Sequence, residues 1–266
     1  MITRLPQRTG YSRTETISDF IVHAVGLSAA LLAVPILILR MWSLGAEPSV
    51  VLGVTIYGAA LITMILCSML YNRAHPDVWS GLLRRLDHSA IYVKIAGTYT
   101  PFALLSPNPT SWFLIWIWAC AALGAALRSF AQDHFRGVAI GLYLVMGWSG
   151  AVTGSAVFAE MSPRVFALIL AGGLLYTCGF AFYVSPRLPY HRTIWHLFVI
   201  VASAVFFAAV TVHSLGSAGA SASAPMIKVG TDEVEWSISR HSPRESCAGL
   251  AEGLRDARQQ NPTKSG

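Results

Sequence analysis

Charge is scarce in this sequence. Only 12% of the 266 residues are Asp, Glu, Lys or Arg, whereas 54% are hydrophobic. A soluble globular domain carries about 25% charged residues. The composition therefore excludes a soluble enzyme of ordinary make-up and an acidic disordered protein.

Cysteine is scarce as well. Of the four cysteines, Cys67, Cys120 and Cys178 lie within apolar stretches and Cys247 lies in the polar C-terminal region. Small thiols are common in apolar surroundings. No CxxC pair or other metal-binding cysteine spacing occurs, which excludes a disulfide scaffold and a cysteine-based metal site.

Long apolar segments, by contrast, fill most of the chain. A membrane-spanning helix needs about 20 apolar residues, whereas a strand of a membrane barrel needs only about 9–11. In lipid, a single span must satisfy its own backbone hydrogen bonds, as a helix does. Seven segments qualify, and the sequence therefore predicts an all-α membrane protein, a bundle of seven transmembrane helices. They are Ser18–Met41, Val50–Tyr71, His88–Leu105, Trp112–Phe130, Val138–Ala159, Val165–Val184 and Ile194–Ser214.

The composition divides the chain into three parts. Residues 1–17 are expected to form a cytoplasmic N-terminal segment, and residues 18–216 the seven-helix domain. Residues 217–266 are expected to be a flexible, disordered tail, because they combine mixed charges with few apolar residues. The tail begins with a Gly/Ala/Ser-rich stretch, Ser217–Pro225, which is typical of a linker.

Arginine is distributed unevenly over the connections between the spans. With the N-terminus in the cytoplasm, ten arginines fall on the inner side and two, Arg40 and Arg164, on the outer side. Cytoplasmic loops of membrane proteins are enriched in Lys and Arg, so we predict a cytoplasmic N-terminus and an outside C-terminus. The net charge of +6 therefore reflects topology, and no basic groove with interleaved aromatic residues indicates a nucleic-acid partner.

Polar and ionisable side chains gather at the predicted cytoplasmic ends of four helices. Ionisable groups within a membrane are expensive and by default indicate a functional site. These groups lie within about two helical turns, roughly 10 Å, of one membrane face. We therefore predict one shared polar site. Its residues are Glu15, Asp19 and His23 on the first segment, Ser68 and Asn72 on the second, Asp87 and His88 on the third, and His191, Arg192 and His196 on the seventh.

Structural explanations remain open for several of these residues. A lone buried histidine is often only a hydrogen-bonded packing residue, and Ser68 can bond to its own helix. Arg192 can simply mark the positive-inside boundary. Lys94 lies about 10 Å deeper than Asp87 on the same helix face. It either snorkels along lipid or pairs with a buried carboxylate.

Several longer motifs resemble the hemolysin III family, the bacterial branch related to the progestin and adipoQ receptors and, more widely, to the alkaline ceramidases. The most specific motif is LRRLDHSAIYVKIAGTYTPF, from Leu83 to Phe102. Supporting motifs are MGW at 146–148, GGLLYTCG at 172–179 and IWHLFV at 194–199. The resemblance covers residues 15–215. It implies an integral, multi-pass protein of the cell membrane, in bacteria the inner membrane, with membrane lipid as its partner; no protein partner is indicated.

The resemblance also implies a zinc site on the cytoplasmic side, built from Ser-x-x-x-His, an Asp and His-x-x-x-His on three helices. Ser68, Asp87 and His196 match this pattern, whereas Asn72 and Arg192 stand where the family has histidines. Asn is a poor zinc ligand and a protonated Arg cannot be one, so the expected donors are His196, Asp87 and, less favourably, Asn72. Arg192 is expected to supply positive charge to Asp87 instead, through a direct or water-bridged pair.

Two functions compete. The favoured one is a role in membrane homeostasis or lipid sensing, with the cytolysis that the family name implies as a secondary effect. The alternative is a metal-dependent membrane hydrolase that acts on lipid amides, as the related ceramidases do. Asp87 would then be the general base or a water-mediated ligand, His196 a ligand, and Ser68 a hydrogen-bond donor to the transition state. The polar shell around them would comprise His23, Asn72, His88, His191, Arg192 and Lys94.

The predicted topology can be tested with reporter fusions. A reporter placed after Gly216 should report the non-cytoplasmic side, and one in the loop around Pro76 the cytoplasm, because seven spans and the arginine asymmetry require it. Paired alkaline phosphatase and green fluorescent protein fusions would measure this. Both reporters on one side would refute the span count and the shared cytoplasmic site with it.

Overall fold

The computed structural model describes residues 12–73, 79–106, 111–130, 136–153, 161–185 and 187–223. These belong to the first of two compact units, Met1–Ala224. Within the described residues the chain forms seven α-helices and no strand, which confirms the all-α prediction. The helices are α1 (Arg13–Ser43), α2 (Pro48–Arg73), α3 (Ser80–Leu104), α4 (Ser111–Phe130), α5 (Arg136–Thr153), α7 (Pro163–Tyr183) and α8 (His191–Ser223).

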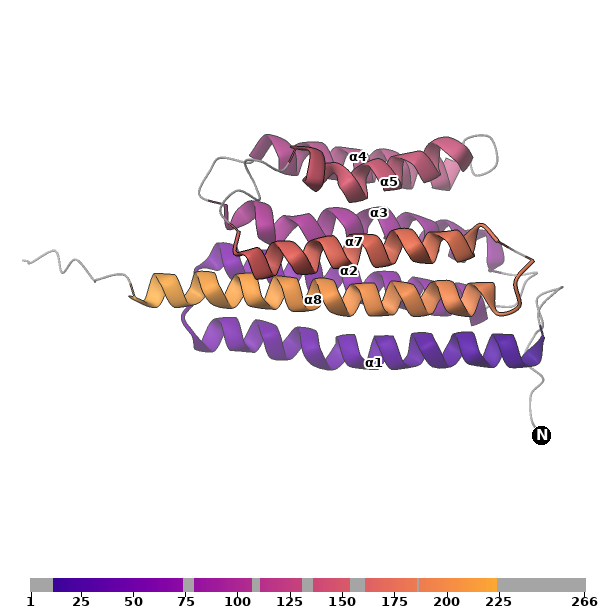
Figure 1. Cartoon of the computed structure of the whole chain (residues 1–266), viewed down its shortest axis with the longest axis horizontal. Coiled ribbons are helices and arrows are strands. Elements are labelled where there is room, and N and C mark those ends of the chain that lie inside the picture. Colours follow the sequence, from indigo (N-terminus) through magenta and orange to yellow (C-terminus); the bar gives the residue numbers. More distant parts are fainter. Residues whose placement is uncertain are drawn as a thin grey trace, which may run out of the picture. The chain divides into compact units, whose positions relative to one another are not determined.

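Five of these helices, α1, α2, α4, α7 and α8, are long and apolar enough to cross a membrane. The other two predicted spans, α3 and the described part of α5, fall short of that standard. In α3 the reason is its polar content, which includes Arg84, Arg85, Asp87 and Lys94. This helix packs against α2, α4, α5 and α8 (Figure 1), so much of its surface faces protein. Polar side chains in membrane proteins favour such interior positions.

All seven helices begin before the apolar segments that predicted them, and the difference is largest for α1, α3 and α8. The α1 helix starts at Arg13, capped by a reciprocal pair: Glu15 N donates to Ser12 Oγ (3.2 Å), and Ser12 N donates to Glu15 Oε2 (2.8 Å). The α3 helix starts at Ser80 and α8 at His191. An apolar run indicates only the lipid-facing part of a helix, so the polar first turns were missed. As a consequence Asp87 lies about two turns inside α3, not at its beginning.

A contact between the first turns of α1 and α8 holds these two helices together. Glu15 Oε1 accepts a hydrogen bond from the backbone N–H of Tyr190, at 2.9 Å. The hydroxyl of Thr193 donates to the backbone oxygen of Glu15 at 3.5 Å. These bonds place the second and third turns of α1 beside the second turn of α8, which is where the polar side chains of both helices lie.

The far end of α8 corrects one prediction. Residues 217–223, expected to be part of a flexible linker, continue the helix to Ser223. The prediction was wrong there because alanine, which recurs in this stretch, has the highest helix propensity of any residue. The rest of the predicted tail, and residues 1–11 of the N-terminal segment, lie outside the described residues.

Helices α2 and α3 approach each other closely at small residues. A Cβ atom at Gly97 would lie 2.7 Å from the Cβ of Ala60, closer than two carbon atoms can pack. Lipid supplies little hydrophobic drive for helices to associate, so close packing at small residues is a main source of their attraction. This packing sets α2 and α3 in register, with Ser68 and Asp87 near the same end of the bundle.

Candidate polar site and cavity

The first and last helices meet through a buried carboxylate and imidazole. Asp19, on α1, is 7% exposed, and His196, on α8, is 8% exposed. Nδ1 of His196 lies 2.5 Å from Oδ1 of Asp19, a short hydrogen bond in which the imidazole donates. A carboxylate removed from water needs such a partner, so each residue positions the other.

His23 extends this pair to α2. Its Nδ1 donates to the backbone oxygen of Asp19 at 2.8 Å, and its Nε2 lies 3.0 Å from the hydroxyl oxygen of Ser68. Because a carbonyl oxygen can only accept, the proton sits on Nδ1, and in the neutral ring Nε2 accepts from Ser68. The rings of His23 and His196 meet edge to face, with centroids 4.3 Å apart. Four side chains from three helices thus form one contiguous group.

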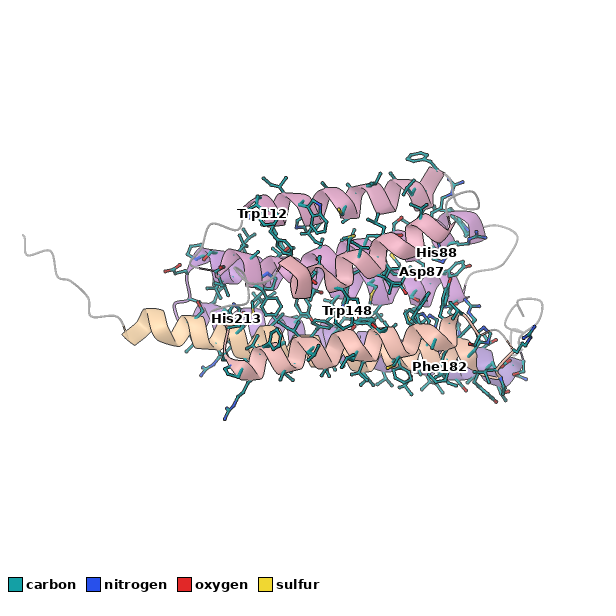
Figure 2. All side chains as sticks on the ribbon, turned by 45° about the horizontal axis from the view of Figure 1, so that its top comes forward. Asp87, His88, Trp112, Trp148, Phe182 and His213 are labelled. Atoms are coloured by element: carbon teal, nitrogen blue, oxygen red, sulfur yellow. The ribbon has the colours of Figure 1, made fainter. Side chains whose placement is uncertain are left out.

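Asp87 joins this group from α3. Its side chain lies close to Ser68 and within electrostatic range of His23, Arg192 and Asp19. Asp87 and His88 lie toward one end of the bundle and His213 toward the other (Figure 2). The structure therefore brings Ser68, Asp87 and His196 near one another.

Asn72 and Arg192 contact each other across α2 and α8. Nη2 of Arg192 donates to Oδ1 of Asn72 at 2.7 Å, and Nδ2 of Asn72 donates to the backbone oxygen of Ser68 at 3.0 Å. The two residues that replace the family's histidines are thus bonded to each other. Arg192 is also an electrostatic neighbour of Asp87. The direct or water-bridged pair between Arg192 and Asp87 stays a prediction.

The donors that could hold a metal ion differ from those expected. Positions 72 and 192 do not fit a metal, because the Asn72 amide is engaged by an arginine whose guanidinium has no free lone pair. Asp19, His23 and His196 do fit by donor chemistry, since carboxylate and imidazole are common zinc ligands. Their ligand atoms all lie within 4.8 Å of one another, and all three residues are buried. Only His196 is common to this group and the predicted donors.

The remaining predicted residues lie around this group. His88 donates from Nδ1 to the backbone oxygen of Arg84 at 2.6 Å, and its ring faces Tyr71 with centroids 6.2 Å apart. His191 is buried, and its Nδ1 lies 3.1 Å from the backbone oxygen of Leu188. Lys94 is deeper in the bundle, away from the carboxylates. The structure thus places His88 and His191 beside the site.

A cavity of about 880 Å³ opens from this polar group into the bundle. Every described helix contributes to its wall, α1 through His23 and α4 through Arg128. The polar end includes Ser68, Asp87 and His196, while the rest is mostly aliphatic and aromatic. Pockets that bind small molecules have this make-up, with apolar walls and a few converging polar groups.

Asp19 is the residue that sequence reasoning undervalued. It was placed on the polar face of the first helix but not among the expected ligands, because no family pattern pointed to it. One signal was available: Asp19 and His23 are four residues apart, and side chains at that spacing lie on one helix face, as paired metal ligands often do. Which helix that face meets could not be read from the spacing.

A family model described as "Haemolysin-III related" matches residues 11–207. The chain is 34% identical over 220 residues to Hemolysin-3 of Bacillus cereus, an alignment that covers 82% of this chain and 100% of that protein. It is 35% identical over 195 residues to a Hemolysin-3 homolog of Bacillus subtilis (strain 168), covering 73% of this chain and 91% of the relative.

A human protein is also similar. The chain is 29% identical over 163 residues to the monocyte to macrophage differentiation factor of Homo sapiens, which covers 58% of this chain and 67% of that protein. The similar proteins therefore include bacterial and animal ones.

The contact between Asp19 and His196 can be measured by a double-mutant cycle. Asp19→Ala and His196→Ala should each lower the free energy of unfolding by about 3–5 kcal/mol, because each leaves a buried partner unpaired. The double variant should lose much less than the sum of the two. Unfolding in detergent, followed by circular dichroism, would give these values.

A matched control lies on the same helix. The Nε2 atom of His213 is buried without a hydrogen-bond partner among the described residues, so His213→Ala leaves no group stranded and should change stability less. Additive effects of Asp19→Ala and His196→Ala would contradict the pairing.

Proposed function

Because the chain belongs to the haemolysin-III related family, we propose that this multi-pass membrane protein binds a membrane lipid in its central cavity. Its role is membrane homeostasis or lipid sensing, in the cell membrane and, in bacteria, the inner membrane. The cavity that runs from the Asp19–His23–Ser68–His196 group into the bundle carries this proposal.

The shape and chemistry of the cavity suit a lipid. Its walls include Tyr99, Phe102, Tyr176 and Phe206, which offer apolar area without flexible chains that binding would have to order. Most polar groups lie at one end of the cavity and Lys94 lies farther along its wall, so a headgroup would find polar partners there. A volume of about 880 Å³ is within the range of pockets that enclose small molecules.

Cytolysis comes second in this proposal. The name Hemolysin-3, which the Bacillus cereus relative carries, implies lysis of cells by that protein. In the described helices of this chain, most of the buried ionisable side chains lie toward one end of the bundle, as Asp19, His23 and His196 illustrate. A water-filled pore would instead need polar groups across the whole membrane. We therefore propose that lysis is an indirect effect of a change in the membrane lipids.

Blocking the cavity tests lipid binding. A Cβ atom at Gly147, which lines the cavity, would meet nothing within 4 Å, so Gly147→Trp should fold and fill the space. We expect native mass spectrometry to detect lipid on the wild-type protein and at least tenfold less on this variant. Gly216→Trp is the control, since Gly216 has equally open surroundings outside the cavity wall. Equal lipid on all three proteins would argue against cavity binding.

The Asp19–His23–His196 group favours a second candidate function, metal-dependent hydrolysis of a lipid amide. A metal ion supplies a nucleophilic water at neutral pH and polarises a carbonyl oxygen. In this chain Asp19, His23 and His196 would hold the ion. Ser68 would orient a substrate oxygen through its hydroxyl, and Asp87, which lies close to Ser68, would accept a proton. The apolar cavity would receive the acyl chain and exclude water.

Metal analysis and an amidase assay test this candidate together. We expect plasma mass spectrometry to find about one zinc per purified chain, reduced at least tenfold in His23→Ala and His196→Ala, because each removes one of few donors. His213→Ala, on the same helix as His196 but outside the group, should keep its zinc. Release of fatty acid from a ceramide panel should be lost in Asp87→Ala. Zinc retained in His196→Ala, or no release by the wild-type protein, would refute the hydrolase candidate while leaving lipid binding untouched.

A further inference from the structure

Lys94 lies in the interior of the bundle. It is 3% exposed, on α3, seven residues or about 10 Å farther along the helix than Asp87. This burial rules out the alternative that Lys94 snorkels along lipid. Its side chain also lines the cavity, so a cationic group stands in the apolar part, beyond the polar site.

Two aromatic rings hold the lysine ammonium. Nζ lies 4.3 Å from the ring centroid of Tyr176 and 4.8 Å from that of Phe206, both within the range of cation–π attraction. Tyr176 is oriented by a hydrogen bond of 2.7 Å to the hydroxyl of Ser203. Phe206 packs on Gly172, where a Cβ atom would come within 2.6 Å of the ring. The rings are therefore fixed from α7 and α8, and they fix Lys94.

No residue that the structure describes accepts a hydrogen bond from the Lys94 ammonium. Among the described residues, no carboxylate, hydroxyl or carbonyl group is bonded to Nζ of Lys94, and no neighbouring charge acts on it. Aromatic faces attract a cation but do not replace the acceptors that its N–H groups had in water. A buried charge without such a partner is costly, so an anion at this position would complete the lysine's surroundings.

Positive charges outnumber negative ones around the cavity. Four of the lining residues are Lys or Arg, namely Arg84, Lys94, Arg128 and Arg192, and one, Asp87, is a carboxylate. In an apolar space with few mobile ions such an imbalance acts strongly on whatever enters. A lipid with an acidic group would be attracted by this excess of positive charge, whereas a neutral lipid would not.

We propose that the cavity binds an acyl lipid with an acidic headgroup, and that Lys94 is the residue that binds this anion. The inference rests on the proposed lipid binding and names its ligand class. The anion is a carboxylate or a phosphate monoester, since an ammonium on a flexible stem accepts both as a point charge. The acyl chain lies along the aromatic and aliphatic walls, which offer it no polar partner.

Binding of matched acidic and neutral lipids tests the assignment. The probes are palmitate and palmitoyl lysophosphatidate as acids, with methyl palmitate as the neutral analogue, titrated into the full chain in nonionic detergent. Lys94→Met keeps the length of the side chain and removes its charge. It should bind the acids about 10- to 100-fold more weakly, the factor expected for one charged hydrogen bond. Its affinity for methyl palmitate should stay within about twofold, and Lys94→Arg should keep most of the affinity for the acids.

Arg128→Met is the matched control, because Arg128 is a second buried cation on the cavity wall. Weaker acid binding in Arg128→Met but not in Lys94→Met would overturn the assignment, as would equal binding of acid and ester by the wild-type protein. If no probe binds the wild-type protein, the proposed function fails with the inference. A loss for palmitate alone, for lysophosphatidate alone or for both supports the assignment and identifies the anion as carboxylate, phosphate or either.

Removal of an unpaired buried charge should not prevent folding, and the melting temperature of Lys94→Met can confirm this. If Lys94 served only to pack against Tyr176 and Phe206, the substitution would change that temperature and leave the preference for acid over ester intact. That outcome would overturn the proposal.

Discussion

The hydrogen bond between Asp19 and His196 joins the first described helix of the bundle to the last, and the rest of the site depends on it. With α1 held against α8, His23 can reach both His196 and Ser68. Apolar side chains meet lipid as readily as they meet one another, so they distinguish poorly between alternative helix arrangements. A buried polar contact distinguishes them strongly, because a carboxylate without a partner is far more costly in this medium than in water.

The polar site combines inherited and exchanged positions. Ser68, Asp87 and His196 stand where the resemblance to hemolysin III proteins places them, while Asn72 and Arg192 bond to each other across α2 and α8. The described residues that could hold a metal ion are Asp19 and His23 on α1 together with His196 on α8. The guanidinium of Arg192, which is bonded to Asn72, also lines the cavity. Metal binding and anion binding therefore remain compatible in this chain, since they use different parts of the wall.

The interior of the bundle carries more positive charge than its fold requires. Arginines at the predicted cytoplasmic end follow from the positive-inside rule, but that rule does not account for Lys94, which lies deep in the cavity against Tyr176 and Phe206. Burial without an acceptor is unfavourable for stability alone. A ligand that supplies an anion would explain why a lysine is buried at this position. Such a ligand would extend along the apolar part of the cavity.

The sequence by itself determined the seven helices and most of their extent, because apolar runs of spanning length report directly on lipid contact. It also indicated that the polar residues share one end, since hydropathy gives depth along each helix. It did not reveal that Asp19 faces His196, that Arg192 bonds to Asn72, or that Lys94 points at two rings. Those contacts depend on the rotation and neighbours of each helix, which packing between helices decides; residues separated by more than a hundred positions meet only there. Residues 217–223 are helical although their Gly/Ala/Ser-rich composition predicted a linker, because that composition also includes alanine, a strong helix former.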